Sequence, residues 1–283
     1  MDLKNQYYYF VTGLPNVSFD SPKLPFTVAE FRAMLNNVLQ PEDKALIDRY
    51  LLKYDNDNLI ALLKNGNAEL SDTGVFTPQQ LKEALEEASA ETNFSNKNVP
   101  PYFADFIHVW LDEDAQNEEW VWEDLMTSFY MDYGMDSQNS VIAKWFELNL
   151  NIGNILSAIY SRKYNMPVVE AIVGNCEVAK TIRKNANARD FGLGTLDIDY
   201  YEQLVRFSEE PEIYERERKI DKLRWNWLTE NTEFDCFGIE YIFAWLCKLQ
   251  ILERWINLNA EKGERVFRQL ISDLRNEVEV PVE

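Results

Sequence analysis

The sequence predicts a mostly α-helical fold. Over most of its 283 residues, apolar side chains recur at spacings of three and four, which is the period of one helix face. Strand-like alternation of apolar and polar residues is scarce. Residues that start and stop helices also fall at the ends of the periodic stretches. These observations favour helices packed against one another.

The expected helices follow in chain order. Residues 46–63 repeat leucine, isoleucine and tyrosine on either side of a polar patch, which predicts a helical pair. Thr77 followed by Pro78 is typical of an N-cap and first helical position, and opens a helix through Ala90. Further helices are expected over 102–133, 140–163, 168–188, from 195 onward, and over 211–229, 237–258 and 264–278.

Three segments are expected outside long helices. Residues 93–101 are polar and end in two prolines, which predicts a loop. The sequence Gly192-Leu193-Gly194 follows a helix-like stretch and is typical of a helix stop and a turn. Residues 7–11 read Tyr-Tyr-Tyr-Phe-Val, which favours β structure, so a short extended N-terminal arm and a short buried helix are both open.

The net charge of the chain limits which classes of partner we expect. Lys and Arg total 28 and Asp and Glu total 48, which gives a formal net charge of −20. Such a chain is repelled by phosphate backbones, so we expect no nucleic-acid partner. Apolar residues make up 46% of the chain and aromatic residues 13%, so the acidity is not that of a disordered tail.

Cysteine usage and hydropathy indicate a cytoplasmic protein. Cys176, Cys236 and Cys247 are odd in number and widely spaced, so we expect reduced core residues rather than a disulfide framework. The most apolar stretch, 239–252, is interrupted by charged residues and predicts a buried helix rather than a membrane span. No secretory signal is recognised at the N-terminus, and no direct lipid anchor is expected.

No pattern in the sequence predicts catalysis. The one histidine, His108, lacks a second ligand at metal-binding spacing, and we expect a partly buried side chain beside Phe106 and Trp110. No phosphate-binding loop is present, and Gly192-Leu193-Gly194 does not follow a buried strand. We therefore predict no enzyme, with no catalytic, cofactor-binding or metal-binding residue and no cofactor.

The acidic segment 112–124 is the strongest candidate for a metal or carboxylate site. A calcium loop needs a central glycine, which the segment lacks. Nothing in its spacing selects a catalytic pair of carboxylates. The segment is therefore interpreted as a solvated charged face.

Tryptophan is frequent and is expected mainly in the core. Pairs spaced by two residues place their side chains on different sides of a helix, which suits a helix packed on more than one side or the rim of a protein interface. Base stacking would require positive charge nearby. The eight residues are Trp110, Trp120, Trp122, Trp145, Trp225, Trp227, Trp245 and Trp255.

A weak internal repeat relates distant parts of the chain. Residues 46–63 and 141–159 align with one inserted residue, and the alignment places Asn58 on Asn154. A looser third copy begins at 221–225 and places Glu240 on Asn154. Each copy predicts a helix, a sharp turn capped by Asn or Asp, and a helix that packs back. The repeat predicts three helical sub-domains, at residues 1–95, 96–190 and 191–283.

Short motifs along the chain resemble a known family, the C-type central-stalk subunits of the V/A-type ATP synthases. These are the counterparts of the d-type subunit in the eukaryotic V-ATPase central stalk. Residues 7–15 also resemble a bacterial family of undefined function whose members accompany V-type ATPase subunits. The residues that carry the central-stalk resemblance are Tyr54-Asp55-Asn56-Asp57-Asn58-Leu59, Leu196-Asp197-Ile198-Asp199-Tyr200-Tyr201, and Gly238-Ile239-Glu240-Tyr241-Ile242-Phe243-Ala244-Trp245-Leu246.

The resemblance implies three similar helical bundles arranged as a funnel, and no active site. In that family the funnel links the central axle to the membrane ring that moves H⁺ or Na⁺. The implied partners are axle and ring subunits, and the implied location is the cytoplasmic face of the inner membrane, reached through those partners. Leu249, Ile251 and Trp255 stand near positions where the family carries charged residues, so its ion pairs are not carried over.

Two other functions remain open from the residues alone. The first is a stand-alone acidic helical adaptor or regulatory protein, which would share the fold class. The second is a metal-dependent hydrolase that uses carboxylates and His108. A thermal shift caused by divalent ions would favour the hydrolase.

Overall fold

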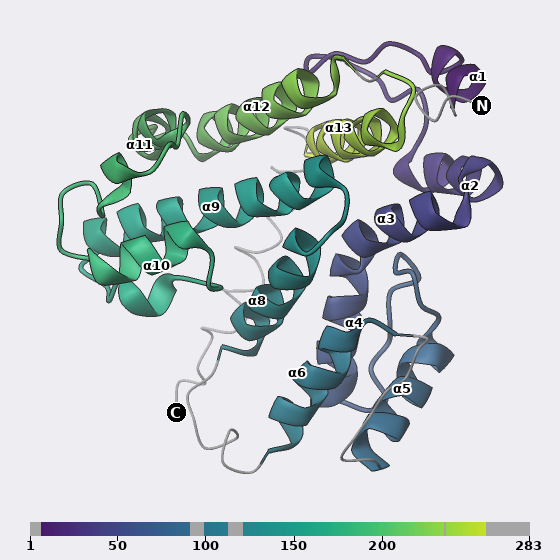
Figure 1. Cartoon of the computed structure of the whole chain (residues 1–283), viewed down its shortest axis with the longest axis horizontal. Helices are drawn as coiled ribbons and strands as arrows, with labels where there is room; N and C mark the ends of the chain where they lie inside the picture. The colour runs from purple at the N-terminus through teal and green to yellow at the C-terminus, as the bar shows by residue number, and fades with distance from the viewer. Residues whose placement is uncertain (1–6, 91–98, 113–120, 235, 259–283) are drawn as a thin grey trace, which may run out of the picture. The chain divides into compact units, whose positions relative to one another are not determined.

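The computed structural model describes residues 7–90, 99–112, 121–234 and 236–258. These residues form helices joined by turns, and no strand occurs among them (Figure 1). The predicted α-helical fold is confirmed. Within the described ranges, no helix combines the length and the apolar character needed to cross a membrane.

The chain packs as two units. Unit 1 comprises Met1–Val38 and Asp221–Glu283, and unit 2 comprises Leu39–Ile220. Helix α12 (Ile213–Thr232) begins in unit 2 and ends in unit 1. This division concerns packing, and the three sub-domains inferred from the sequence repeat remain a prediction.

Unit 1 is built around α13 (Ile239–Asn257), whose residues are buried on several sides. Helix α2 (Val28–Val38) packs along it, and the Phe31 and Trp245 rings lie 4.4 Å apart. The backbone N–H of Val28 donates to Glu253 at 2.9 Å. The short helix α1 (Tyr8–Thr12) occupies the β-prone N-terminal run, so the extended arm is excluded and a helix is confirmed, but Val11 is its only buried residue.

Unit 2 is built around the 24-residue helix α9 (Ser140–Lys163), which packs against α8, α10, α11 and the short 3₁₀ helix η2 (Figure 1). Asn139 caps its start by accepting from the N–H groups of Val141 and Ile142, both at 3.1 Å. The other helices are α3 (Pro41–Leu51), α4 (Lys53–Lys64), α5 (Pro78–Ala90), α6 (Pro101–Leu111), α8 (Trp122–Met135), α10 (Glu177–Lys184) and α11 (Tyr201–Ser208), with η2 (Val169–Ala171) and η3 (Leu193–Thr195).

Several helix boundaries differ from the sequence prediction. The helix predicted over 102–133 is divided, because α6 ends at Leu111 and α8 begins at Trp122. The helix predicted over 168–188 is reduced to η2 and α10, and Gly174 between them has a φ of 73°, which no continuous right-handed helix allows. The helix expected from 195 starts only at Tyr201. The helix predicted over 264–278 lies outside the described residues.

Gly134 lets α8 approach α9 closely, which gives a testable prediction. A Cβ atom at Gly134 would lie 2.1 Å from Cδ1 of Phe146. We expect Gly134→Ala to lower the free energy of unfolding by about 2 kcal/mol, because either helix must move. Gly153→Ala in α9 is the matched control: nothing lies within 4 Å of its Cβ position, and it should be neutral or stabilising. Urea unfolding of both variants checks the difference.

Candidate functional site

The two aligned asparagines of the repeat make the same pair of hydrogen bonds to a loop. In α4, the Asn58 amide donates to the Ser71 carbonyl at 2.8 Å and accepts from the Ser71 N–H at 2.9 Å. In α9, Asn154 donates to the Val173 carbonyl and accepts from the Val173 N–H, both at 2.8 Å. Each side chain therefore pairs with one peptide of the loop that follows its helix, and we call these two pairs the loop anchors.

The loop anchors correct the predicted role of these residues. The repeat predicts Asn58 and Asn154 near a sharp turn between two helices, but both lie inside a helix and are buried. Helix α9 runs without interruption, whereas the first copy is broken only at Leu52, between α3 and α4. The alignment of the two positions thus identifies equivalent residues, and the asparagine side chains hold loops rather than cap helices.

The positions one turn earlier also match. Asp55, fully buried in α4, accepts from the N–H groups of Val75 and Phe76 at 2.8 and 3.0 Å, just before α5 begins. Its counterpart Asn151 in α9 accepts from the Cys176 thiol, the N-cap residue of α10, at 3.4 Å. In both copies, a buried polar residue therefore fixes the start of the next helix.

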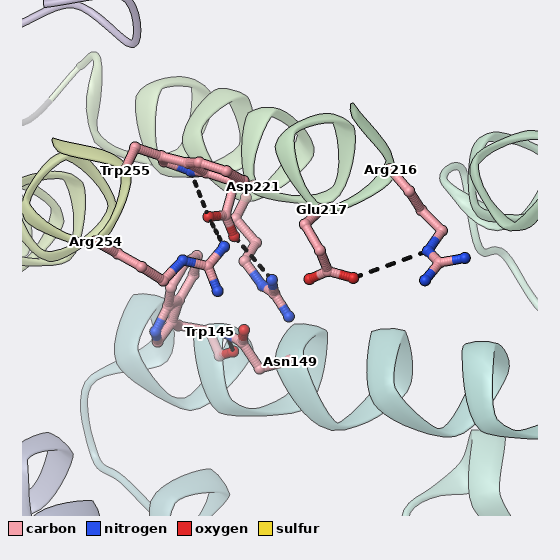
Figure 2. A network of polar contacts seen from close by, with 8 residues as sticks. Trp145, Asn149, Arg216, Glu217, Asp221, Arg254 and Trp255 are labelled. Atoms are coloured by element: carbon pink, nitrogen blue, oxygen red, sulfur yellow. Dashed lines mark hydrogen bonds and ion pairs between the residues drawn. The ribbon is translucent and has the colours of Figure 1, made fainter. Parts of the chain in front are cut away.

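The third copy of the repeat, which begins at 221–225 and reaches Glu240, is built differently from the first two. Its two parts lie on α12 and α13, which are separate helices, so the third copy does not reproduce the single helix of the second. In unit 1 the buried carboxylate is Asp221, which accepts from Arg224 at 2.9 Å, from Trp255 Nε1 at 2.9 Å and from Arg254 (Figure 2). This network joins α12 to α13 within unit 1.

The remaining motif residues are partly internal and partly exposed. Tyr200 is half-buried, and its hydroxyl accepts from Asn151 at 3.3 Å. Asn56 accepts from the buried Tyr102 hydroxyl at 2.6 Å. Ile242 and Phe243 in α13 are fully buried. Many of the motif residues therefore specify the fold, whereas Asp57, Asp197 and Asp199 are exposed and accessible for contact with partners.

An aromatic surface on unit 1 is the clearest candidate for such a contact. Tyr9 is 91% exposed and Phe234 is 97% exposed, while Tyr8 is 46% exposed. The Tyr8 ring lies 5.6 Å from Tyr9 and 4.8 Å from Phe237, and the Tyr7 N–H donates to the Phe237 carbonyl at 3.2 Å. We call these three rings, together with the exposed Phe234 three residues before Phe237 in the sequence, the aromatic patch. Exposed aromatic clusters of this kind are typical of protein interfaces.

The aromatic patch is only partly visible in the sequence. The aromatic run at residues 7–10 stands out, but its pairing with the α12–α13 turn does not. The tryptophans are predicted mainly in the core, and this is confirmed for Trp145, Trp225, Trp245 and Trp255, which are buried. Trp120 lies outside the described residues.

The predicted candidates for chemistry do not assemble into a metal site. His108 is half-buried, as expected. In the acidic segment, Glu123 pairs with Lys64 at 2.6 Å, and residues 113–120 lie outside the described residues. No group of three metal-ligating side chains gathers in the described part of the chain.

A polar pocket in unit 2 is lined by ionisable side chains but offers no strong nucleophile. Asp132, Lys144, Glu147 and Cys176 are among the residues that line it, beside α8, α9 and the start of α10. Burial raises the pKa of the Cys176 thiol, so the thiol stays protonated at neutral pH and is a weak nucleophile. Burial also raises the pKa of Asp132, which the nearby Lys180 partly offsets.

Comparison with known proteins identifies a family but no individual relative. A family model described as "Protein of unknown function (DUF2764)" matches residues 4–278. No curated protein matches the chain, and no solved structure matches it. The matched range includes both loop anchors and the aromatic patch.

Proposed function

We propose that this chain, which belongs to the family described as protein of unknown function (DUF2764), is a non-catalytic rotor-linker subunit of a V-type ATPase or ATP synthase. In this role it couples the central axle to the membrane ring that transports H⁺ or Na⁺. The observation that supports the proposal most strongly is the pair of loop anchors at Asn58 and Asn154.

The loop anchors suit a part that transmits torque. The family that the sequence motifs resemble is built from repeated helical bundles, and the two anchors give two segments of this chain the same internal construction. Each anchor joins a loop to the middle of a helix through two hydrogen bonds. The buried asparagine side-chain amide and the N–H and C=O groups of the loop residue then have hydrogen-bond partners without water. Loops held in this way resist local opening, which a rotor element under load requires.

The aromatic patch supplies a surface for a protein partner. Tyr and Phe side chains bury a large area at a low cost in conformational entropy, and they are enriched at interfaces. With partner subunits on the membrane ring, the chain itself needs no membrane-spanning segment. We therefore infer that attachment to the cytoplasmic face of the membrane occurs through protein contacts.

Co-purification tests the proposal. The tagged chain is isolated from its own host's membranes in mild detergent, and the accompanying chains are identified by mass. We expect the catalytic, axle and ring subunits of the ATPase together. Recovery of the tagged chain with none of these subunits would leave a stand-alone acidic adaptor as the better interpretation.

Removing the aromatic patch should weaken this association without unfolding the protein. We expect Tyr9→Ala combined with Phe234→Ala to lower recovery of the ATPase subunits at least about tenfold, the effect of losing one or two interface hot spots. Because both side chains are almost fully exposed, the free energy of unfolding should change by no more than about 0.5 kcal/mol. Val121→Ala, which removes an exposed apolar side chain elsewhere, is the control and should leave recovery unchanged.

A further inference from the structure

A small pocket lies on one face of α13 in unit 1. Tyr241, Trp245 and Lys248 line it from that helix, at the spacing of three and four residues that brings side chains together on one helix face. Asn16 and Val17, from the segment that follows α1, also line it. The pocket has a volume of about 60 Å³, which is room for a few water-sized groups.

Lys248 is the one lysine of this pocket, and it is half-buried. Its Nζ lies 5.3 Å from the centre of the Trp225 ring on α12, which is a cation–π contact. The other lining residues are apolar or uncharged. The Lys248 ammonium is therefore partly removed from water in surroundings that offer it little compensation.

No carboxylate of the described residues pairs with Lys248, although Asp and Glu total 48 in the chain. Three other lysines of the described part, Lys44, Lys64 and Lys219, each form an ion pair with an Asp or Glu. The charged form of Lys248 thus lacks the stabilising partner that these lysines have.

The absence of a counter-charge changes the protonation of Lys248. Desolvation lowers the pKa of its ammonium, and the adjacent Cys247 thiol partly offsets this effect. At neutral pH, a larger fraction of Lys248 than of an exposed lysine is therefore the free amine. Only the free amine is a nucleophile, and a lysine desolvated in an apolar pocket is one of the activated nucleophiles that enzymes use.

We propose that Lys248 is an acylation site, which reacts with a short acyl phosphate. The Lys248 amine attacks the carbonyl carbon, a new N–C bond forms, and the C–O bond to the phosphate breaks. The phosphate leaves with the bonding electron pair, and the proton of the amine passes to it. The volume of the pocket limits the acyl group to a short one, such as acetyl.

Two features of the pocket suit this reaction. Its lining residues include no Asp or Glu, so no carboxylate there repels the phosphate dianion. The product is a neutral amide, so the pocket no longer holds an ammonium that burial disfavours. The site goes beyond the rotor-linker role and does not depend on it, because the reaction needs only this chain and the acyl phosphate.

Acetylation of the purified full chain tests this proposal. The chain is incubated with acetyl phosphate at neutral pH, and peptide mapping by mass spectrometry gives the rate of acetylation at each lysine. We expect Lys248 to react several-fold faster than Lys82, an exposed lysine of α5, although Lys248 is the less accessible of the two. In urea that unfolds the chain, the two lysines should react at equal rates, because the pocket is lost.

A carboxylate added to the pocket should slow the reaction. Asn16→Asp keeps the size of the side chain and places a negative charge among the lining residues, so it favours the ammonium form of Lys248. The acetylation rate of Lys248 should then fall several-fold. Asn231→Asp is the matched control: it makes the same change at an exposed position on α12 and should leave the rate unchanged.

Three results would overturn the proposal: Lys248 reacts no faster than Lys82, its advantage persists in urea, or Asn16→Asp leaves its rate unchanged. Circular dichroism shows whether Asn16→Asp is folded. If that variant is not folded, the comparison of Lys248 with Lys82 in the unaltered chain, folded and in urea, decides the matter.

Discussion

Replacing Asp221 with alanine is expected to lower the free energy of unfolding of unit 1 by about 3 kcal/mol. The Asp221 carboxylate is buried and accepts from Arg224, Arg254 and the indole N–H of Trp255. The substitution leaves the buried Trp255 N–H without an acceptor and separates two guanidinium groups from their counter-charge. Removing one partner of a buried, hydrogen-bonded charge network costs several kcal/mol.

Two further variants separate the parts of this network. Arg254 is 44% exposed, so Arg254→Ala should cost about 1 kcal/mol or less, because water replaces its contact with the carboxylate. Asp221→Asn keeps an acceptor for the Trp255 N–H, so its loss of unfolding free energy should lie between those of Asp221→Ala and Arg254→Ala. Denaturant unfolding followed by tryptophan fluorescence gives all three values. Equal losses in Asp221→Ala and Arg254→Ala would contradict the assigned role of the buried carboxylate.

Removing the anchor in α9 is expected to have an effect of similar size. Asn154→Ala leaves both the N–H and the carbonyl of Val173 without their hydrogen-bond partner, and we expect a loss of about 3 kcal/mol. Hydrogen exchange should locate the damage, with faster exchange of the Val173 amide before the helix itself opens.

An exposed asparagine provides the control for this experiment. Asn231 also donates to a backbone carbonyl, that of Trp227 at 2.9 Å, but from an exposed position on α12. Asn231→Ala should therefore change the free energy of unfolding by no more than about 0.5 kcal/mol. If Asn154→Ala leaves the hydrogen exchange rate of the Val173 amide unchanged, the loop does not depend on its anchor. Asn58→Ala should repeat the result at Ser71 in the first copy.

The comparison of the two anchors shows how far sequence reasoning reaches here. The spacing of apolar residues identifies the helices and makes Asn58 and Asn154 equivalent, because the buried neighbours Leu59 and Ile155 occupy the same helix face in both copies. The predicted capping role of the two asparagines is wrong. Asn is a common capping residue, and its true partners lie 13 and 19 residues further along the chain, a distance that differs between the copies.

The candidate surfaces are harder to foresee than the fold. Apolar periodicity predicts which residues are buried, but a tyrosine or phenylalanine left exposed looks the same in the sequence as one in the core. The aromatic patch depends on the Tyr7 N–H donating to the Phe237 carbonyl. This contact joins segments far apart in sequence, and it is fixed only once the helices have packed.

Ion transport in membrane vesicles tests the rotor-linker proposal most directly. Inverted vesicles are prepared from host cells that lack this chain, and ATP hydrolysis and ATP-driven H⁺ or Na⁺ uptake are measured in the same sample. If the chain couples axle to ring, hydrolysis persists while uptake is lost, and the purified protein restores uptake, whereas Tyr9→Ala with Phe234→Ala does not. Ion uptake that is the same with and without the chain would contradict the proposed function.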